Sequence, residues 1–328
     1  MGSLIQNTIF GKSNYKINTY IGGIGNAINT PALLAAKLGI SASRIKMFRI
    51  LDNNIECAII GGTYSLTNSS WLSSNMTYFI DEKNLAVTDE GRVFRSATLL
   101  QKIKLNGLLN TGDESFTNTN LVEISLPNVT NLKGRYGSFR INPKLKRIIL
   151  PEASYSEWSF SGMDGCTSLE TVYIPKLAIL RSGSSAALNN FVFASNKTGF
   201  KIYASPLAQT SYLGGVDKDI AWAITNRSAI VRYVTDFTKP NAVIDLSVIT
   251  INSTSMKFQF TTPSSQNGID FYEVYVNGVY KQELKASGDI ISDFVENTSY
   301  AISLIAVDIF YNRSDLSNVI NLSTNNAA

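Results

Sequence analysis

Five carboxylates in the middle of the chain are the residues best suited to acid–base chemistry: Glu123, Glu152, Glu157, Asp164 and Glu170. Two facing carboxylates suffice for glycoside hydrolysis, one acting as the acid and the other as base or nucleophile. None of the five lies in a recognisable catalytic motif, and repeats scatter carboxylates over solvated faces. The sequence therefore favours a protein that is not an enzyme. A carbohydrate-active enzyme ranks third, after a virion surface protein and a bacterial adhesin.

Other catalytic chemistry is limited by composition, because the chain has no histidine and only two cysteines, Cys57 and Cys166. Without histidine, the usual general base, the commonest metal ligand and every Ser-His or Cys-His dyad are missing. Two thiols alone make neither a zinc site nor a disulfide framework, and we expect both to be buried as small apolar residues. The glycine-rich segment 21–27 lacks the Lys-Ser/Thr ending of a phosphate loop. We expect no cofactor and no metal.

Aromatic side chains are better candidates for function, because a flat ring suits sugars and protein anchors. Tyr155 and Trp158 do not match the core positions of the repeats described next, so each either caps its own loop or offers its face to a ligand. Ile149 and Tyr173 are expected to form an apolar pair on an open strand face. The candidate ligand-binding residues are Trp158, Tyr155, Tyr173, Ile149 and Arg147.

A repeat occupies the middle of the chain. Four segments fit the pattern Leu-x-x-Ile/Val-x-Leu/Ile, starting 21, 24 and 24 residues apart at Leu100, Leu121, Leu145 and Leu169. A large apolar residue precedes each segment by five or six positions, namely Phe94, Phe116, Phe139 and Met163. This spacing predicts one short strand per repeat, with the preceding apolar residue filling the core from the opposite wall. A single repeat cannot bury its own apolar side chains, so neighbouring repeats must stack on one another.

The segment from Met163 to Pro175 resembles a repeat of the BspA-like leucine-rich class, whose units run Phe-x-x-Cys-x-x-Leu-x-x-Ile-x-Leu-Pro. The resemblance covers about 125 residues and implies a leucine-rich-repeat solenoid. The other copies lack the Cys, and their length varies. A degenerate last copy is expected around Phe200, followed by a cap that ends with a strand at 230–234.

The strand positions that point away from this core read Lys102, Glu123, Arg147 and Thr171 along the stack. Opposite charges alternate in this series, and cross-strand pairing worth roughly 0.2–1 kcal/mol per pair explains the alternation without a ligand. We expect Leu145, Ile148 and Leu150 to point inward, and Lys146, Arg147 and Ile149 to point outward.

Two further regions flank the repeats. Residues 1–62 are expected to form a small α+β head, with a helix that begins at Thr30-Pro31 and stops at Gly39, and a hairpin from Ile45 to Ile60. Residues 238–328 contain only strand patterns and the tight-turn signal Asn277-Gly278. There Tyr300 and the strand after it resemble the tyrosine corner and F strand of a fibronectin type III domain. Phe258 and Phe260 replace its usual core Trp.

The expected fold is therefore mainly β: a head at 1–62, an irregular leucine-rich-repeat solenoid with its cap at 63–237, and a fibronectin type III-like β-sandwich at 238–328. The net charge of +4 is small, and no Lys/Arg cluster stands out in the sequence, so nucleic acid is not an expected partner. No apolar stretch approaches the roughly 20 residues of a membrane span.

In module order the chain resembles the spike, tail-fibre and head-fibre proteins of bacteriophages that infect Bacteroidota. This resemblance implies a non-catalytic virion surface protein for host attachment and adhesion, multimeric and often trimeric, bound to other virion proteins and to a host cell-surface glycan or protein. A bacterial cell-surface adhesin is the alternative. The N-terminus shows no export signal, which favours a virion, because virions assemble in the cytoplasm and leave by lysis.

Overall fold

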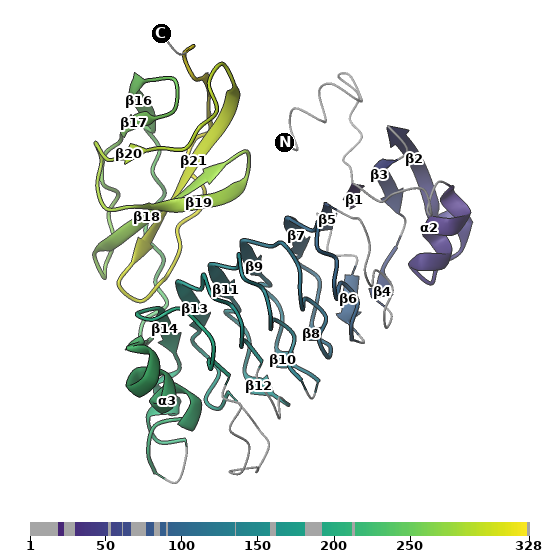
Figure 1. The fold of residues 1–328 in the computed structure, drawn as a ribbon, viewed down its shortest axis with the longest axis horizontal. Helices are drawn as coiled ribbons and strands as arrows, with labels where there is room; N and C mark the ends of the chain where they lie inside the picture. The colour runs from purple at the N-terminus through teal and green to yellow at the C-terminus, as the bar shows by residue number, and fades with distance from the viewer. Residues whose placement is uncertain are drawn as a thin grey trace. The chain divides into compact units, whose positions relative to one another are not determined.

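The computed structural model describes residues 19–22, 30–51, 54–60, 62–66, 77–81, 86–89, 91–134, 136–157, 162–180, 192–211 and 214–326. The candidate ligand residue Trp158 lies outside these ranges. The chain divides into two compact units, one of residues 14–233 and one that contains residues 234–328. Both units are built mainly of β-strands, as expected (Figure 1).

The larger unit contains helix α2 (Pro31–Lys37), whose N-cap Thr30 accepts a hydrogen bond from the Leu33 amide and whose first turn holds Pro31. Gly39 follows with a left-handed φ of 62°, which ends the helix. A 3₁₀ turn, η1 (Ala42–Arg44), leads into strands β2 (Ile45–Leu51) and β3 (Asn54–Ile60), which pair antiparallel. The helix and hairpin expected from the sequence are thus confirmed.

The expected head is not a separate compact unit. Strand β1 (Thr19–Gly22) pairs with both β3 and β5 (Tyr78–Asp81), and β5 continues in parallel to β7 (Lys102–Leu105). The buried helix residues Leu34 and Leu38 also belong to the same hydrophobic core as the repeats. The sequence misses this continuity because strand pairing between distant segments leaves no local pattern.

The described residues between 86 and 233 form stacked turns of chain, here called the coil, with three walls. One wall is a parallel sheet of β9 (Glu123–Ser125), β11 (Arg147–Ile149), β13 (Thr171–Ile174), β14 (Lys201–Ala204) and β15 (Ile230–Tyr233), each one repeat apart (Figure 1). A second wall holds the short parallel strands β8 (Asn110–Thr111), β10 (Asn131–Leu132) and β12 (Tyr155–Ser156). The pair β4 (Tyr64–Leu66) and β6 (Ala86–Asp89) lies before it in the chain.

The third wall consists of tight turns that carry the predicted core residues Phe94, Phe116, Phe139 and Met163, all fully buried. Three of them stack in succession, with ring centroids 5.6 Å apart for Phe94–Phe116 and 5.7 Å for Phe116–Phe139. Backbone hydrogen bonds also join one turn to the next, such as Phe116 N to Ser138 O at 2.9 Å. The inference that each repeat fills the core from two opposite walls is therefore confirmed.

The last turn of the coil carries a cap, which consists of the 3₁₀ turn η2 (Pro206–Gln209) and helix α3 (Lys218–Arg227). Asp217 caps α3 by accepting from the amides of Asp219 and Ile220, and it also accepts from Leu180 in the last repeat. Burial, the largest cause, raises the pKa of this carboxyl above its ordinary value despite the three amide donors. The cap is thus fastened to the coil through a buried acid.

The smaller unit is a sandwich of two antiparallel sheets. One sheet is β16 (Ser247–Ile251), β17 (Met256–Gln259) and β20 (Ile290–Ile291), and the other is β19 (Val279–Leu284), β18 (Ile269–Val276), β21 (Ser299–Asp308) and β22 (Ile320–Ser323). The core includes Phe258 and Phe260, as predicted. The short strand β20 was not expected from the sequence, since two residues carry no alternation.

The predicted tyrosine corner is present. The Tyr300 hydroxyl accepts a hydrogen bond from the Val295 amide at 2.9 Å, and its ring packs on Phe294 with centroids 4.8 Å apart. Asn277 and Gly278 have φ values of 52° and 72°, as the tight turn between β18 and β19 requires. The three-plus-four strand order and this corner give the unit a fibronectin type III-like fold.

Candidate functional site: the outer face of the second coil wall

Only one of the five candidate ligand residues is described as exposed. Tyr155 lies on β12 with 52% of its surface exposed, whereas its neighbour Ser156 is buried. The expectation that Tyr155 lies off the core is confirmed. Trp158 is outside the described residues, and Arg147, Ile149 and Tyr173 are all buried.

The burial of Arg147 corrects the expectation that it lies on an open face. Its side chain is fully buried, and its Nε donates to Glu123 Oε2 at 3.1 Å, while Nη2 makes a second, closer contact with the same oxygen. The pairing Glu123–Arg147–Thr171 is in register along three adjacent strands. Cross-strand pairing, which the charge alternation predicted, accounts for this arginine as a structural ion pair within the coil.

Ile149 and Tyr173 are likewise buried, at 3% and 6% exposure. They face each other on β11 and β13, and the Tyr173 ring meets that of Tyr203 on β14 at a centroid distance of 6.3 Å. Both side chains point away from the hydrophobic core of the coil, as predicted, because that core includes Ile148 but neither Ile149 nor Tyr173. The prediction that both side chains are exposed was wrong. Each lies on an interior strand of a parallel sheet with a neighbouring strand on both sides, and the alternation of residues within one strand carries no information about these neighbours.

Tyr155 belongs to a row of side chains that crosses the second wall. Asn110 on β8, Asn131 on β10 and Tyr155 on β12 are paired in register. The Asn131 amide nitrogen donates to the Asn110 side-chain oxygen at 2.9 Å, so the two amides are fixed in one orientation. A planar amide ladder that ends at an exposed ring offers both hydrogen-bonding groups and an apolar face.

Exposed apolar residues border this row. Leu109, with 46% of its surface exposed, precedes Asn110. Ile179, with 44% exposed, lies one repeat beyond Tyr155, where the chain is fastened by a hydrogen bond from the Ser156 hydroxyl to Leu180 O at 2.9 Å. The second-wall face is hereafter the set Leu109, Asn110, Asn131, Tyr155 and Ile179.

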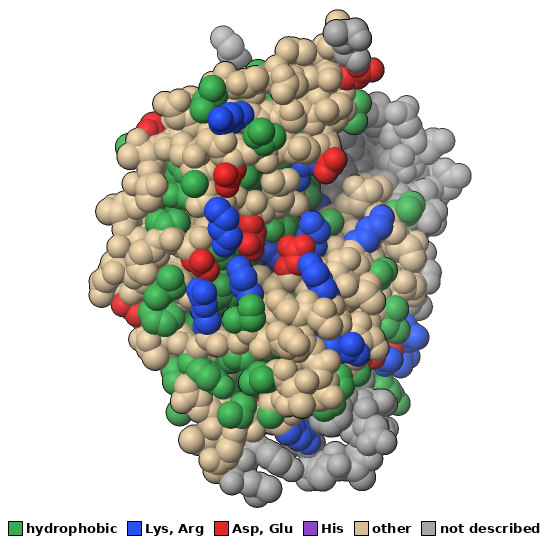
Figure 2. All heavy atoms as spheres, turned by 60° about the vertical axis from the view of Figure 1, so that its left-hand side comes forward, with side chains coloured by type: hydrophobic (Ala, Val, Ile, Leu, Met, Phe, Trp, Pro, Cys, Tyr) green, Lys and Arg blue, Asp and Glu red, His purple; other side chains and the backbone are tan. Residues whose placement is uncertain are grey.

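Four of the five carboxylates considered for glycosidase chemistry make contacts within the coil, whereas Glu157 is exposed. Besides Glu123, Glu152 pairs with Lys176, and Glu170 lies near Lys146 and Lys197 at 3.8 and 3.9 Å. Asp164 accepts a hydrogen bond from the Ser195 amide at 2.7 Å. On the face drawn in Figure 2, Lys and Arg side chains lie beside Asp and Glu side chains. Among the described residues, no group of His, Cys, Asp or Glu is arranged to hold a metal ion.

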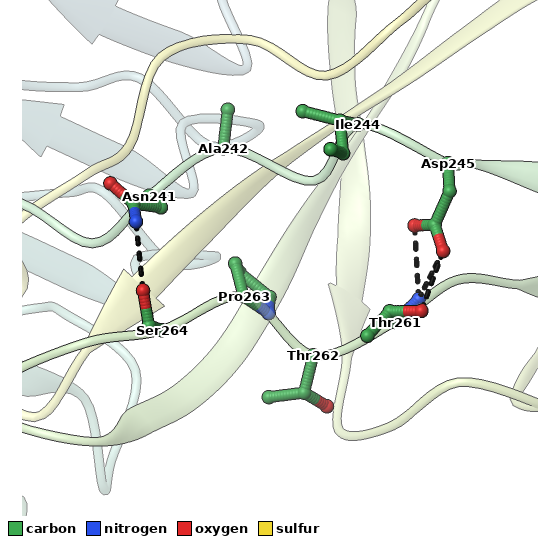
Figure 3. A pocket seen from close by; sticks show the side chains of 8 residues that line it. All are labelled: Asn241, Ala242, Ile244, Asp245, Thr261, Thr262, Pro263 and Ser264. Carbon is green, nitrogen blue, oxygen red and sulfur yellow. Dashed lines mark hydrogen bonds between the residues drawn. The ribbon is translucent and has the colours of Figure 1, made fainter.

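The sandwich has a shallow hollow of about 340 Å³ between the segments 241–245 and 261–264 (Figure 3). Asn241 bonds to Ser264 at one end, and Asp245 bonds to Thr261 at the other. Hydrogen bonds from the hydroxyl and the amide of Thr261 hold the pKa of Asp245 below its ordinary value. Ile244, with 84% of its surface exposed, contributes an apolar wall.

Sequence reasoning missed the asparagines. Asn142 is fully buried and accepts from the Thr119 amide and hydroxyl while it donates to the carbonyls of Phe116 and Phe139. It occupies the position of Cys166 in the next repeat, whose thiol donates to the same Phe139 carbonyl. The sequence signal for Asn142 is its place in the repeat, at the position of the Cys in the BspA-like pattern, where any polar residue that bonds to the backbone can serve.

Burial raises the pKa of the Cys166 thiol to about 12, and the predicted burial of this cysteine is confirmed. The Cys57 side chain is not among those described.

No helix within the described parts of the chain is long and apolar enough to cross a membrane. No protein-family model matches the sequence, and no curated protein matches it.

Solved structures do match part of the chain. A fibronectin type III domain of human fibronectin type III domain containing protein 3 is 17% identical with a TM-score of 0.26, covering 28% of this chain and 93% of its own. Domains A168–A170 of titin are 19% identical with a TM-score of 0.25, covering 30% of this chain and 35% of theirs. The chitinase ChiA74 from Bacillus thuringiensis is 19% identical with a TM-score of 0.26, covering 34% of this chain and 18% of its own. The fibronectin type III-like assignment of residues 234–328 rests on their own strand order and on the Tyr300 corner.

Proposed function

We propose that this protein is a non-catalytic recognition protein that binds a carbohydrate through the second-wall face. The observation that carries the proposal is the exposed Tyr155 ring at the end of the in-register amides Asn110 and Asn131. An aromatic face stacks on the apolar side of a sugar ring, and side-chain amides bond to hydroxyl groups on its edge. Leu109 and Ile179 extend the apolar surface on either side.

The rigidity of the site supports this function. Each residue of the row lies on a strand or on a coil turn that is bonded to its neighbours, as in the hydrogen bond from Thr130 N to Leu109 O at 3.0 Å. A site on regular elements loses little conformational entropy when a ligand binds. The coil itself is proposed to be a BspA-like leucine-rich-repeat solenoid, and its stacked strands and buried Phe series support that assignment.

In its biological setting we propose a bacteriophage spike or fibre on the virion surface, joined to other virion proteins through residues 1–62 and assembled as a homo-oligomer, by resemblance a trimer. The partner is a host cell-surface glycan. Several weak sugar sites held in one multimer gain orders of magnitude in avidity. The support for the setting is the resemblance in module order, whereas the support for sugar binding is the geometry of the second-wall face.

Binding to immobilised polysaccharide from the host envelope tests the site. Tyr155→Ala is expected to weaken binding about tenfold, the factor that corresponds to roughly 1.4 kcal/mol, and Tyr155→Phe to retain it, because the ring is kept. Phe237→Ala is the matched control, since Phe237 is also 52% exposed but lies at residue 237, outside the coil. If Tyr155→Ala binds as well as the parent, the site is wrong.

The setting is tested separately with an antibody against the protein. Detection on purified phage particles supports the virion proposal, whereas detection on uninfected cells alone replaces it with a bacterial adhesin. Release of reducing sugar from the polysaccharide by the parent chain would overturn the non-catalytic assignment and favour a carbohydrate-active enzyme.

A further inference from the structure

The third wall of the coil carries three arginines that surround a single carboxylate. Glu114 is nearly buried, and its carboxylate lies 3.3 Å from Arg92 Nε, 2.8 Å from Arg95 Nη1 and 3.9 Å from Arg140 Nη1. These four residues come from three successive turns of the wall. They are here called the arginine cluster.

The backbone holds the cluster in place. Arg92 and Glu114 both have left-handed φ values, 52° and 53°, at equivalent points of successive turns. The Arg92 amide donates to Asp113 O, and the Glu114 amide donates to Gly137 O at 2.9 Å. The positions of the charged groups are therefore set by the coil rather than by flexible loops.

The charges of the cluster do not balance. Three guanidinium groups and one carboxylate leave two positive charges in excess. Two other carboxylates of the wall accept from backbone amides, Asp113 from Tyr136 N at 2.8 Å and Asp164 from Ser195 N at 2.7 Å, and among the described residues neither forms an ion pair with these arginines. Among the other described ion pairs of the coil, Lys176 and Glu152 balance each other. Lys146 and Lys197 both lie near Glu170, which leaves an excess of one positive charge. The excess is thus particular to this wall.

Hydrogen-bond donors are also left over at the cluster. Arg140 Nε is buried and has no hydrogen-bond partner, and neither has the hydroxyl of Thr117. Thr117 is 3% exposed and lies in the turn between those of Arg95 and Arg140, since Ser96 N bonds to Thr117 O and Asn118 N bonds to Arg140 O. A buried donor without a partner destabilises the fold, so an acceptor that reaches either group would form a hydrogen bond that is otherwise missing.

We propose that the arginine cluster is a binding site for an oxyanion group of a ligand, a carboxylate or a sulfate. The side chains of Arg92, Arg95 and Arg140 are 45%, 38% and 26% exposed, so an anion can approach them from solvent. Guanidinium groups match the two oxygens of such a group with paired hydrogen bonds. A single compact cluster holds one anionic group at a fixed point. The site lies on a different wall from Tyr155 and stands independently of the proposed function.

NMR of the ¹⁵N-labelled full chain tests the site, with sodium sulfate and sodium glucuronate as separate probes at ionic strength held constant with chloride. We expect the Arg140 Nε–Hε signal to shift saturably with each probe that the site accepts. A response to sulfate alone or to glucuronate alone identifies the group. The absence of a saturable shift with both probes overturns the proposal.

Two variants separate binding from a merely structural ion network. Arg95→Met is expected to weaken binding about tenfold, the factor for roughly 1.4 kcal/mol. Glu114→Gln removes the competing carboxylate and is expected to strengthen binding, whereas a purely structural network would give no tighter binding. Lys176→Met is the control, because it removes one positive charge from a balanced pair of the same coil. Equal effects of Arg95→Met and Lys176→Met would reduce the site to non-specific charge and reject it.

Discussion

Gly137 marks the closest approach of two turns of the coil. Its φ is +76°, and a Cβ atom built on it would lie 2.1 Å from the Gly162 Cα, so two constraints act at one position. The left-handed backbone alone disfavours any residue with a side chain, by roughly 1–2 kcal/mol. The clash with a backbone atom cannot be relieved by a rotamer change. At the residue scale, the spacing of the repeats therefore depends on a missing side chain.

Gly137→Ala is expected to lower the free energy of unfolding by about 2–4 kcal/mol, measured by urea denaturation. Gly199→Ala is the matched control, because Gly199 has a φ of +73° and nothing within 4 Å of the added Cβ. It should cost only the backbone penalty, about 1–2 kcal/mol. Equal costs for the two variants would show that the turns can move apart without loss.

Asp245 provides a pH-dependent prediction at the same scale. Because its folded pKa is lowered, chiefly by the Thr261 hydroxyl, its contribution to stability is present above the unfolded pKa and is lost as the pH falls through the folded pKa. Thr261→Val removes the hydroxyl donor and keeps the backbone amide. We expect the pKa of Asp245 to rise toward its ordinary value in a ¹³C carboxyl titration. An unchanged pKa would mean that the amide alone is responsible.

At the scale of elements, the two units use different devices to fix strands. The coil repeats a buried polar residue at one position, Asn142 in one turn and Cys166 in the next, to bond carbonyls that the turn leaves without partners. The sandwich instead fastens the start of β21 to the preceding segment through Tyr300. Both devices satisfy backbone groups that lie outside the strands.

Tyr300→Phe is expected to destabilise the sandwich by about 0.5–1.5 kcal/mol, because the solvent-exposed Val295 amide loses the hydroxyl that accepts its hydrogen bond. The ring contact with Phe294 remains in this variant, so the loss reports the hydroxyl alone. The measurement is the urea midpoint of the full chain followed by a signal from the sandwich. A variant as stable as the parent would show that water replaces the hydroxyl at no cost.

At the scale of the whole molecule, the chain consists of a larger unit of residues 14–233, which contains the coil, and a second unit, which contains the sandwich. The sandwich has its own hydrophobic core, formed by residues from Val243 to Ala306. Stability of such units is set by the apolar surface that each buries internally. The two cores contain different residues, which indicates separate folding.

A fragment of residues 234–328 is accordingly expected to fold alone and to unfold cooperatively. Its ¹H–¹⁵N spectrum should show the dispersion of a β-sandwich, with amide signals that superimpose on those of the full chain for the core strands β17, β18 and β21. A collapsed spectrum, or core-strand signals displaced throughout, would show that the sandwich needs the coil in order to fold.

The sequence by itself determined the features that depend on local periodicity. The repeat of Leu121, Leu145 and Leu169 placed strands β9, β11 and β13 with the correct inward residues, and Thr30-Pro31 placed the start of α2. The Asn277-Gly278 turn and the Tyr300 corner were equally accessible, because turn chemistry is written in adjacent residues.

Tertiary structure alone decided which predicted surface residues are exposed and which charges meet. Arg147, Ile149 and Tyr173 point away from the core as predicted, yet they are buried, because exposure depends on neighbouring strands and not on alternation within one strand. Asn110, Asn131 and Tyr155 form a row only after three turns are stacked in register. The arginine cluster likewise brings together residues of three turns, a proximity that the stacking of the turns creates and that no local sequence pattern encodes.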